Sequence, residues 1–329
     1  MPLIRCLFLH LAVAVVAASA AAPIAWGEVY PSRPIAIVVP FPAGGPIDTL
    51  ARIMADRMKV SLGQPVIVEN VPGAGGTFGL GRVARATPDG YTASIGDWTS
   101  HVASGAIYPI QFDLLRDFEP VSLLTSSPQV IVGKSALPFK DLKDLIAWLK
   151  ANPDKASAAT VGPGSTPHIC GIYFQNNTGT RFQLVPYRGG AQAMQDLVGG
   201  HVDFMCAEAS QTLPHVRGGK MKAYAVLAKS RWTAAPETPT IDEAGVPGLY
   251  ISSWRGLWVP RGTSKEVIAK LNAAVVDALA DPAARQRLFD LGHEIFPREQ
   301  QTPEALGAHH KAEIGKWWPI IKAADIKVE

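Results

Sequence analysis

The sequence carries few charges for its length. Only 18% of its 329 residues are Asp, Glu, Lys or Arg, and 31 basic against 28 acidic residues leave a formal charge of +3. Lys and Arg never form a run longer than two, whereas proteins that bind nucleic acid usually show a basic stripe. The charge pattern therefore argues against nucleic acid as a partner.

Motifs that would carry catalysis or hold a metal ion are missing. The sequence has no HExxH, no CxxC and no G-x-S-x-G, and its glycine-rich loops lack both GxGxxG spacing and the Lys-Ser/Thr end of a P-loop. The adjacent pair His309 and His310 would point to different sides of a helix, which is a poor arrangement for a metal site. We predict no catalytic residue, no metal site and no cofactor.

Long apolar runs are also scarce. One run of about ten residues, 7–16, follows Arg5 and passes into the small residues AASAAAPIAWG. It is too short for a bilayer core, which needs about 20 residues, but it fits a secretory signal. We predict a signal peptide over residues 1–27, cut after Gly27 or, alternatively, near Ala20. The exported chain would then carry a charge of +2, since Arg5 is lost with it.

Cysteine is rare, and two of the three cysteines, Cys170 and Cys206, lie in the exported part. In an oxidising compartment such a pair forms a disulfide when the two Cα atoms lie within about 7 Å. The sequence alone leaves a disulfide and two buried free thiols equally open.

Strand and helix patterns alternate along the chain. A strand is expected over 35–40, and a helix follows from about Asp48, because Leu50, Ile53, Met54 and Met58 recur at helical spacing. A second strand over 65–70 leads to a glycine loop and a helix that ends near residue 86. This alternation predicts an α/β fold with a parallel or mixed sheet and helices on both faces.

Two longer segments, 120–133 and 248–260, are rich in strand-forming residues and are not interrupted by a helical pattern. They enclose a region with its own alternation of strands and helices. We therefore expect two α/β lobes joined by two hinge strands. One lobe is discontinuous and consists of residues 28–125 and 253–329, and the other consists of residues 126–252.

Glycine loops that each follow a strand and precede a helix are the best candidates for a binding site. Such loops expose backbone N–H groups at the positive end of a helix, which suits a carboxylate or a phosphate. Three of them, 41–52, 69–79 and 160–170, would line one crevice at the ends of the strands. For the first loop the alternative is a tight turn in which Asp48 only caps the helix.

Other polar residues near these loops allow two interpretations each. Arg188 would offer a bidentate guanidinium to a carboxylate, or would lie on the surface. Glu208, which would leave a strand over 202–206 at the crevice, would bind an amine or a hydroxyl group, or would face solvent. Ser165 and His168 are three residues apart and would suit an exported hydrolase, but no third group orients the histidine and no oxyanion site is evident.

Taken together, six ordered segments resemble the substrate-binding proteins of the tripartite tricarboxylate transporters, often called the Bug or TctC family. The segments are YPSRPIAIVVPFPAGGPIDTLAR, VIVENVPGAGGTFGLGRVARATPDGYT, FDLLRDFEPVSLL, GPGSTPHICGIYF, VPYRGGAQAMQDLVGGHVDFM and RLFDLGHEIFPREQQTPEALGAHHKAEIGKW. The resemblance covers nearly the whole exported chain.

The resemblance implies a Venus-flytrap fold of the type II periplasmic binding class and a site for a small carboxylate between the lobes. The ligand-binding residues that it implies or that the loops suggest are Phe41, Ala43, Gly44, Asp48, Gly75, Thr99, His101, Gly164, Ser165, His168, Arg188, Ala207 and Glu208. The chain departs from the family pattern at two of them, because many members have Asp in place of Ala207 and Asn or Gln in place of Glu208.

We expect a periplasmic, non-catalytic receptor that captures a small organic carboxylate, either a mono-, a di- or an aromatic acid. It would act as a monomer and deliver the ligand to the membrane subunits of a tripartite tricarboxylate transporter. A receptor that signals to a membrane kinase and, with less support, the Ser/His hydrolase are the alternatives.

Overall fold

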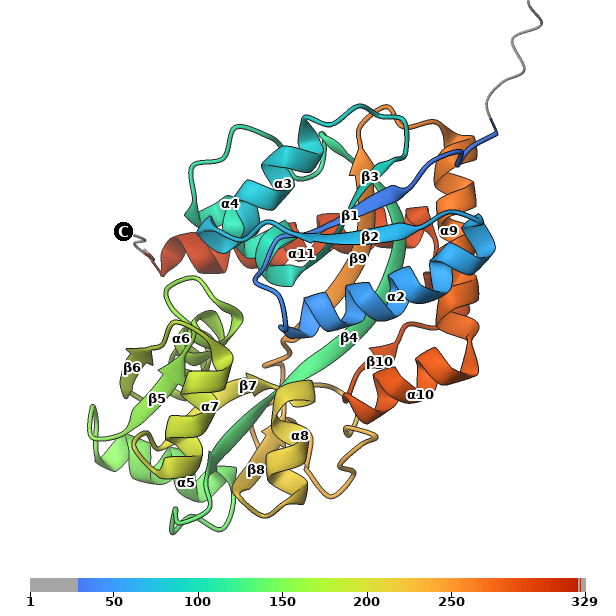
Figure 1. Ribbon diagram of the computed structural model, residues 1–329. Helices are drawn as coiled ribbons and strands as arrows, with labels where there is room; N and C mark the ends of the chain where they lie inside the picture. The colour runs from blue at the N-terminus through green and yellow to red at the C-terminus, as the bar shows by residue number, and fades with distance from the viewer. Residues whose placement is uncertain (1–28, 325, 327–329) are drawn as a thin grey trace, which may run out of the picture. The chain divides into compact units, whose positions relative to one another are not determined.

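The computed structural model describes residues 29–324 and residue 326. The predicted signal peptide lies outside the described residues. Residues 33–324 belong to one compact unit. Its strands and helices alternate along the chain (Figure 1), which confirms the predicted α/β fold.

The elements have the following bounds. The strands are β1 (Ile35–Val39), β2 (Val66–Asn70), β3 (Thr92–Asp97), β4 (Phe118–Lys134), β5 (Ser157–Thr160), β6 (Gln183–Pro186), β7 (Phe204–Glu208), β8 (Met221–Val226), β9 (Ser252–Pro260) and β10 (Glu294–Ile295). The α-helices are α2 (Pro46–Leu62), α3 (Thr77–Ala84), α4 (Ser104–Ile107), α5 (Leu142–Ala151), α6 (Thr166–Thr178), α7 (Gly190–Gly199), α8 (Ala209–Arg217), α9 (Lys265–Ala280), α10 (Pro282–Asp290) and α11 (Pro303–Ala323). Three short helical segments are η1 (Ala74–Gly76), η2 (Thr99–Ala103) and η3 (Arg298–Gln300).

One long strand, β4, connects two halves of a curled sheet, and it crosses from one half to the other in Figure 1. The strand order is β2-β1-β3-β9-β4-β7-β5-β6, with β8 and β10 also paired to β4. β4 pairs with β9 as far as Pro128, which lies opposite Ser252, and with β7 from Gln129, which lies opposite Glu208. We call the part with β1, β2, β3, β9 and β10 the first half, and the part with β5 to β8 the second half.

Within each half, parallel strands end at the same edge. β1 pairs in parallel with β2 and β3, and β5 pairs in parallel with β6 and β7. Because a helix follows each of these strands, the helix N-termini gather at the carboxyl ends of the strands. The mixed sheet expected from the sequence is thus confirmed, and each half has one carboxyl edge that carries loops.

Two strand boundaries differ from the expectation. The strand expected over 202–206 is β7 and runs on through Ala207 and Glu208, because both residues pair with β4 at Val130 and Gln129. In the segment expected to be a strand over 248–260, β9 begins only at Ser252.

Local signals account for most of the helices. Side chains of Ser264, Asp281 and Thr302 accept hydrogen bonds from backbone N–H groups three residues further on, as helix N-caps do. In α2 the apolar residues at helical spacing, including Leu50, Ile53, Met54 and Met58, are all buried. The helix thereby places a continuous apolar face against the sheet.

A disulfide joins Cys170 of α6 to Cys206 of β7, with the two Cα atoms 6.2 Å apart. The bond ties a helix of the second half to the strand beneath it. It closes a loop across a sequence separation of 36 residues, and such a loop restricts the unfolded chain considerably.

Removal of this bond is expected to destabilise the protein. In the variant Cys170→Ala/Cys206→Ala the free energy of unfolding should fall by about 4 kcal/mol, because the unfolded chain regains the entropy of the open loop. Urea unfolding, followed by circular dichroism, measures the change. The wild-type protein in excess reductant should unfold at nearly the same midpoint as the variant, and equal midpoints for the variant and the oxidised wild type would contradict the expectation.

Candidate functional site

The carboxyl edges of the two halves face each other across a short distance. The Thr99 hydroxyl, directly after β3, lies 2.9 Å from the Thr166 hydroxyl at the start of α6. Nearby, a Cβ atom on Gly164 would come within 2.7 Å of the Ile107 side chain. The segment after β3 therefore touches the segment after β5. We call the loops that follow β1, β2 and β3 on one side and β5, β6 and β7 on the other the facing edges.

Asp48 holds the first loop in shape. Its buried carboxylate accepts hydrogen bonds from Gly44 N at 2.8 Å, Arg52 Nε at 3.0 Å and Asn70 Nδ2 at 3.0 Å. Burial alone would raise its pKa, but the hydrogen bonds from Arg52, Gly44 and Asn70 lower the pKa below its usual value. Asn70 also donates to Phe41 O at 3.1 Å. Asp48 is thus a positioning residue, because these donors already engage both carboxylate oxygens.

Several helices at the facing edges begin without a side-chain cap. The N-caps of α2, α3 and α7 are glycines, namely Gly45, Gly76 and Gly189. The N-cap of α8 is Glu208, whose side chain makes no capping hydrogen bond, but Ser127 Oγ accepts from the Ser210 N–H in the first turn of this helix. By contrast, side-chain oxygens cap α5, α6, α9, α10 and α11. Uncapped N–H groups at the positive end of a helix dipole suit an anionic group.

The third loop holds Ser165 and His168 in separate roles. The Ser165 hydroxyl donates to Gly162 O at 2.7 Å and caps α6 by accepting from the His168 backbone N–H. The His168 ring accepts at Nδ1 from Gly164 N at 3.2 Å, and burial lowers its pKa. A neutral ring that accepts at Nδ1 carries its proton on Nε2, so His168 can donate one hydrogen bond from Nε2. Ser165 and His168 do not form a nucleophile–base pair.

A buried ion pair crosses between the two halves. The Arg255 guanidinium of β9 donates from Nη2 to Glu208 Oε1 at the end of β7, and these side chains are only 1% and 11% exposed. Arg255 also donates to Ser253 O at 3.1 Å, and Ser210 Oγ donates to Glu208 at 2.8 Å. His293 Nδ1 lies 3.4 Å from Arg255 Nη1. Glu208 thus neither faces solvent nor stands alone, since it neutralises a buried cation.

Asp97 is a second carboxylate beside Arg255. The two residues lie opposite each other in the pairing of β3 with β9. Burial raises the pKa of Asp97 to about 6, although hydrogen bonds from Ser100 and the charge of Arg255 act in the opposite direction. Two carboxylates therefore lie near one guanidinium at neutral pH, and Glu208 forms an ion pair with it.

The remaining predicted residues are placed as follows. Ala43 is exposed in the first loop and Arg188 is exposed before α7, whereas Ala207 is buried inside β7. Gly75 has a positive φ of 63°, and a Cβ atom there would meet the Tyr108 ring at 2.7 Å. His101, for which the resemblance implied a ligand contact, is completely buried and stacks on Trp258 with 3.6 Å between ring centroids. Its side chain packs in the core of the first half.

Sequence reasoning missed four residues that shape the facing edges. They are Asn70, Asp97, Thr166 and Arg255. The signal for Arg255 was available, because a charge within the apolar strand SSWRGLWVP has to find a partner once it is buried. Asp97 and Asn70 offered a similar signal, because each is a polar residue at the end of a strand, β3 and β2 respectively.

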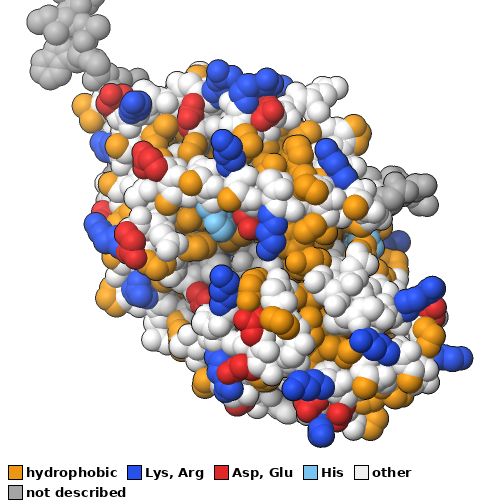
Figure 2. All heavy atoms as spheres, turned by 180° about the vertical axis from the view of Figure 1, so that it is seen from behind, with side chains coloured by type: hydrophobic (Ala, Val, Ile, Leu, Met, Phe, Trp, Pro, Cys, Tyr) orange, Lys and Arg blue, Asp and Glu red, His pale blue; other side chains and the backbone are white. Residues whose placement is uncertain are grey.

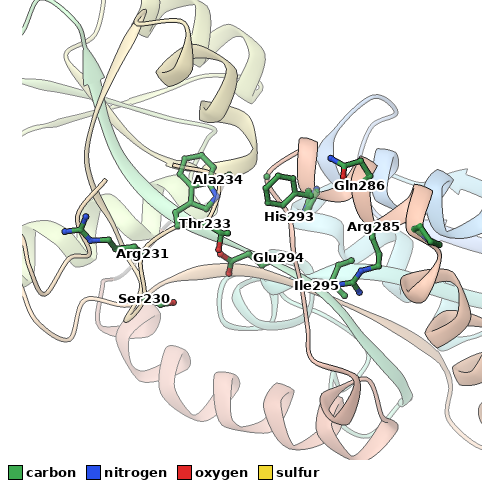
Figure 3. Close-up of a pocket in the computed structure, with 13 residues that line it drawn as sticks. Ser230, Arg231, Thr233, Ala234, Arg285, Gln286, His293, Glu294 and Ile295 are labelled. Carbon is green, nitrogen blue, oxygen red and sulfur yellow. The ribbon is translucent and has the colours of Figure 1, made fainter. Parts of the chain in front are cut away.

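A cavity of about 850 Å³ lies beside this ion pair. It is lined on one side by the segment 230–234 of the second half and on the other by residues of α10 and the segment 292–295. Figure 3 shows Arg231 and Thr233 on one wall and Arg285 and His293 on the other. None of the predicted site residues is among the described residues that line it, but His293 connects it to Arg255.

The surface charges, the possible metal ligands and the helices of the described residues point to no further site. Positive and negative side chains are mixed over the face in Figure 2. No three His, Cys, Asp or Glu side chains among residues 29–324 lie close enough together to hold a metal ion. None of the described helices combines the length and the apolar character that crossing a membrane requires.

The raised pKa of Asp97 makes a testable contribution to stability. An acid with a pKa near 3.9 when unfolded and about 6 when folded stabilises the native state at low pH, and this stability is lost as pH rises from about 4 to about 6. In Asp97→Asn the loss is absent. The free energy of unfolding of the variant minus that of the wild type should therefore rise by about 2 kcal/mol between pH 4 and pH 7.

Urea unfolding of both proteins at each pH measures this difference. Asp290→Asn, which changes an exposed carboxylate of α10, is the matched control and should show almost no such rise. If the difference in unfolding free energy between Asp97→Asn and the wild type does not change with pH, burial does not raise the pKa of Asp97.

The chain is similar to proteins of known family over most of its length. Residues 50–326 match the family model described as the tripartite tricarboxylate transporter family receptor. The protein BugT of Bordetella pertussis is 34% identical over 314 residues, which are 95% of each chain.

Solved structures agree with this match. MatC from Rhodopseudomonas palustris with bound malate has a TM-score of 0.81 at 38% identity and covers 89% of this chain and 100% of its own. The periplasmic binding protein BugD has the same TM-score and identity, with coverage of 91% and 100%. The R. palustris protein Rpa4515 with adipate has a TM-score of 0.82 at 32% identity, with coverage of 91% and 99%. The resemblance seen in the sequence is thereby confirmed, and the chain belongs to the tripartite tricarboxylate transporter receptor family.

Proposed function

We propose that this protein is a periplasmic receptor that binds a small organic carboxylate between its facing edges and delivers it to a membrane permease. The observation that carries the proposal is that the N-termini of α2, α3 and α7, which have no side-chain cap, gather at these edges, within a family whose solved relatives include proteins with malate and with adipate. Backbone N–H groups stabilise a carboxylate without a paired cation.

The ligand carboxylate binds at the start of α2 and to His168. Gly45 leaves the first N–H groups of α2 without a side-chain partner, and His168 donates from Nε2 because Nδ1 is occupied by Gly164. Asp48 contributes indirectly by holding the first loop in the shape that presents these groups. Phe41, Ala43 and Gly44 belong to the same loop.

The two halves of the sheet act as lobes that close on the ligand. The lobes are residues 28–125 with 253–329 and residues 126–252, and the change of partner along β4 between Pro128 and Gln129 supports a hinge near these boundaries. Hinge closure around a ligand is a common way for a receptor to present two distinct surfaces to a partner. The predicted signal peptide over residues 1–27 provides export.

Hydrolysis is the less supported function. The Ser165 hydroxyl donates to a backbone carbonyl, and the His168 ring accepts from a backbone N–H, so neither is arranged for nucleophilic attack. The family and its solved relatives are likewise solute-binding proteins.

Ligand-induced stabilisation tests the proposed function directly. A ligand at about 100 times its dissociation constant adds about 2.7 kcal/mol to the free energy of unfolding. We expect at least one acid in a panel of mono-, di- and aromatic carboxylates to raise the melting temperature, while sugars and metal ions leave it unchanged. Stabilisation by a sugar or a metal ion alone, with no response to any acid, would refute carboxylate capture.

The role of Asp48 gives a second test. Asp48→Asn removes the charge that Arg52, Gly44 and Asn70 share, and the first loop loses its fixed shape. The affinity for the best carboxylate should fall about tenfold, which corresponds to the loss of one or two hydrogen bonds. Isothermal titration calorimetry measures it.

Asp56→Asn on the same helix is the matched control, because Asp56 is an exposed acid paired with Lys59. Its affinity should equal that of the wild type. If a folded Asp48→Asn protein bound the acid as tightly as the wild type, Asp48 would be no more than a residue of the helix start.

A further inference from the structure

Arg255 is a buried cation at the facing edges whose charge is already matched from within the protein. Its guanidinium donates to Glu208 and to the carbonyl of Ser253. Glu208 in turn accepts from Ser210. An arginine without a carboxylate partner would suit a carboxylate of a ligand, but here the chain supplies that carboxylate itself. The buried Arg255 Nε is left without a hydrogen-bond partner among the described residues.

The order of the strands places this ion pair deeper than the proposed carboxylate site. In the first half the sequence of strands toward β4 is β1, β3 and β9, and in the second half it is β6, β5 and β7. The first loop and His168 follow β1 and β5, whereas Arg255 and Glu208 belong to β9 and β7. A ligand held at the first loop and His168 reaches the ion pair when its far end points toward β4, and this is the orientation that we infer.

The charges around this deeper position do not favour a second anion. Glu208 and Asp97 both lie beside the one guanidinium of Arg255, and the pKa of about 6 leaves Asp97 mostly ionised above neutral pH. A second carboxylate on the ligand would meet two carboxylates and one cation that is already paired. Burial strengthens such repulsion, because a low-dielectric environment screens charges weakly.

We propose that Glu208 takes the place of a ligand's second carboxylate, so that the receptor selects monocarboxylates with an uncharged far end over dicarboxylates of equal length. The proposal rests on the proposed function, because it assumes that one carboxylate binds at the facing edges. It sets this chain apart from the two solved relatives that hold malate and adipate, which are both dicarboxylates.

A purely structural role for the ion pair makes a different prediction. If Glu208 and Arg255 only hold the two halves together, weakening them changes the affinity for all acids by the same factor. The ratio of affinities for a monocarboxylate and its matched dicarboxylate therefore separates the two roles. Two matched pairs are hexanoate with adipate and benzoate with terephthalate.

The experiment measures these ratios by calorimetry for the wild type, Glu208→Gln and the double variant Glu208→Gln/Arg255→Gln. In the wild type each monocarboxylate that binds should bind at least about tenfold more tightly than its dicarboxylate. In Glu208→Gln the ratio should fall toward one, because only Asp97 then remains as a carboxylate beside Arg255 and the guanidinium balances its charge. In the double variant the preference for the monocarboxylate should return, since Asp97 then has no cation beside it.

Glu208→Gln keeps the size of the side chain and an oxygen that accepts from Ser210 and Arg255. Circular dichroism checks that it is folded. If it is not, the wild-type ratio for the two matched pairs still decides the proposal, because a dicarboxylate that binds as tightly as its monocarboxylate overturns it. Asp154→Asn, which breaks the exposed pair with Arg181 in the same half, is the matched control and should retain the wild-type ratio.

The outcomes are distinct. A wild-type protein that binds dicarboxylates as tightly as monocarboxylates, or a ratio that Glu208→Gln leaves unchanged, overturns the role given to Glu208 and leaves carboxylate capture intact. If no acid binds to any of the proteins, the proposed receptor function fails as well.

Discussion

The hydrogen bonding of β4 is the constraint on which the rest of the structure depends. A single strand belongs to both halves, and it changes partners from β9 to β7 between Pro128 and Gln129. Proline has no N–H group to donate, so Pro128 makes no N–H hydrogen bond at the point where the partners change, and Gln129 N donates to Ile251 O instead of to β9. The loops at the two carboxyl edges face each other because this strand fixes where each half begins.

The facing edges use two different means to manage charge. Near the first loop and His168 they offer backbone and ring N–H groups, which attract an anion without placing a full positive charge in the protein. Near β4 they contain full charges, which Arg255, Glu208 and Asp97 share. Removing such charges from water costs several kcal/mol per ion, so the network is poorly explained as a source of stability. It is better explained by the proposed selection between ligands with one and with two carboxylates.

The sequence predicted the parts of the fold that depend on local patterns. The alternation of apolar strands and helices gave the α/β class, and the helical spacing of Leu50, Ile53 and Met54 marked α2 correctly. The glycine loops that follow β1, β2 and β5 were identified as candidates from composition and position alone. The order of the strands brings their carboxyl ends together, so local reasoning and topology agree there.

Contacts between distant segments were not accessible in this way. Nothing near Glu208 in the sequence indicates Arg255, which is 47 residues away, and only the pairing of β9 and β7 with β4 brings the two together. His101 is the opposite case, because it lies close in sequence to the predicted site but does not take part in it. Its ring turns toward Trp258 and not toward the loops of the first half. Packing decided that orientation, and no spacing rule in the sequence records it.

The disulfide also fixes the distance between two candidate site residues of the second half. His168 lies two residues before Cys170, and Glu208 lies two residues after Cys206. A covalent bond therefore connects the start of α6 with the end of β7, and the separation of His168 from Glu208 is set within the second half alone. Whether the halves move apart or together, this pair keeps its spacing. A molecule that contacted both His168 and Glu208 would therefore have to match a distance that the second half sets by itself.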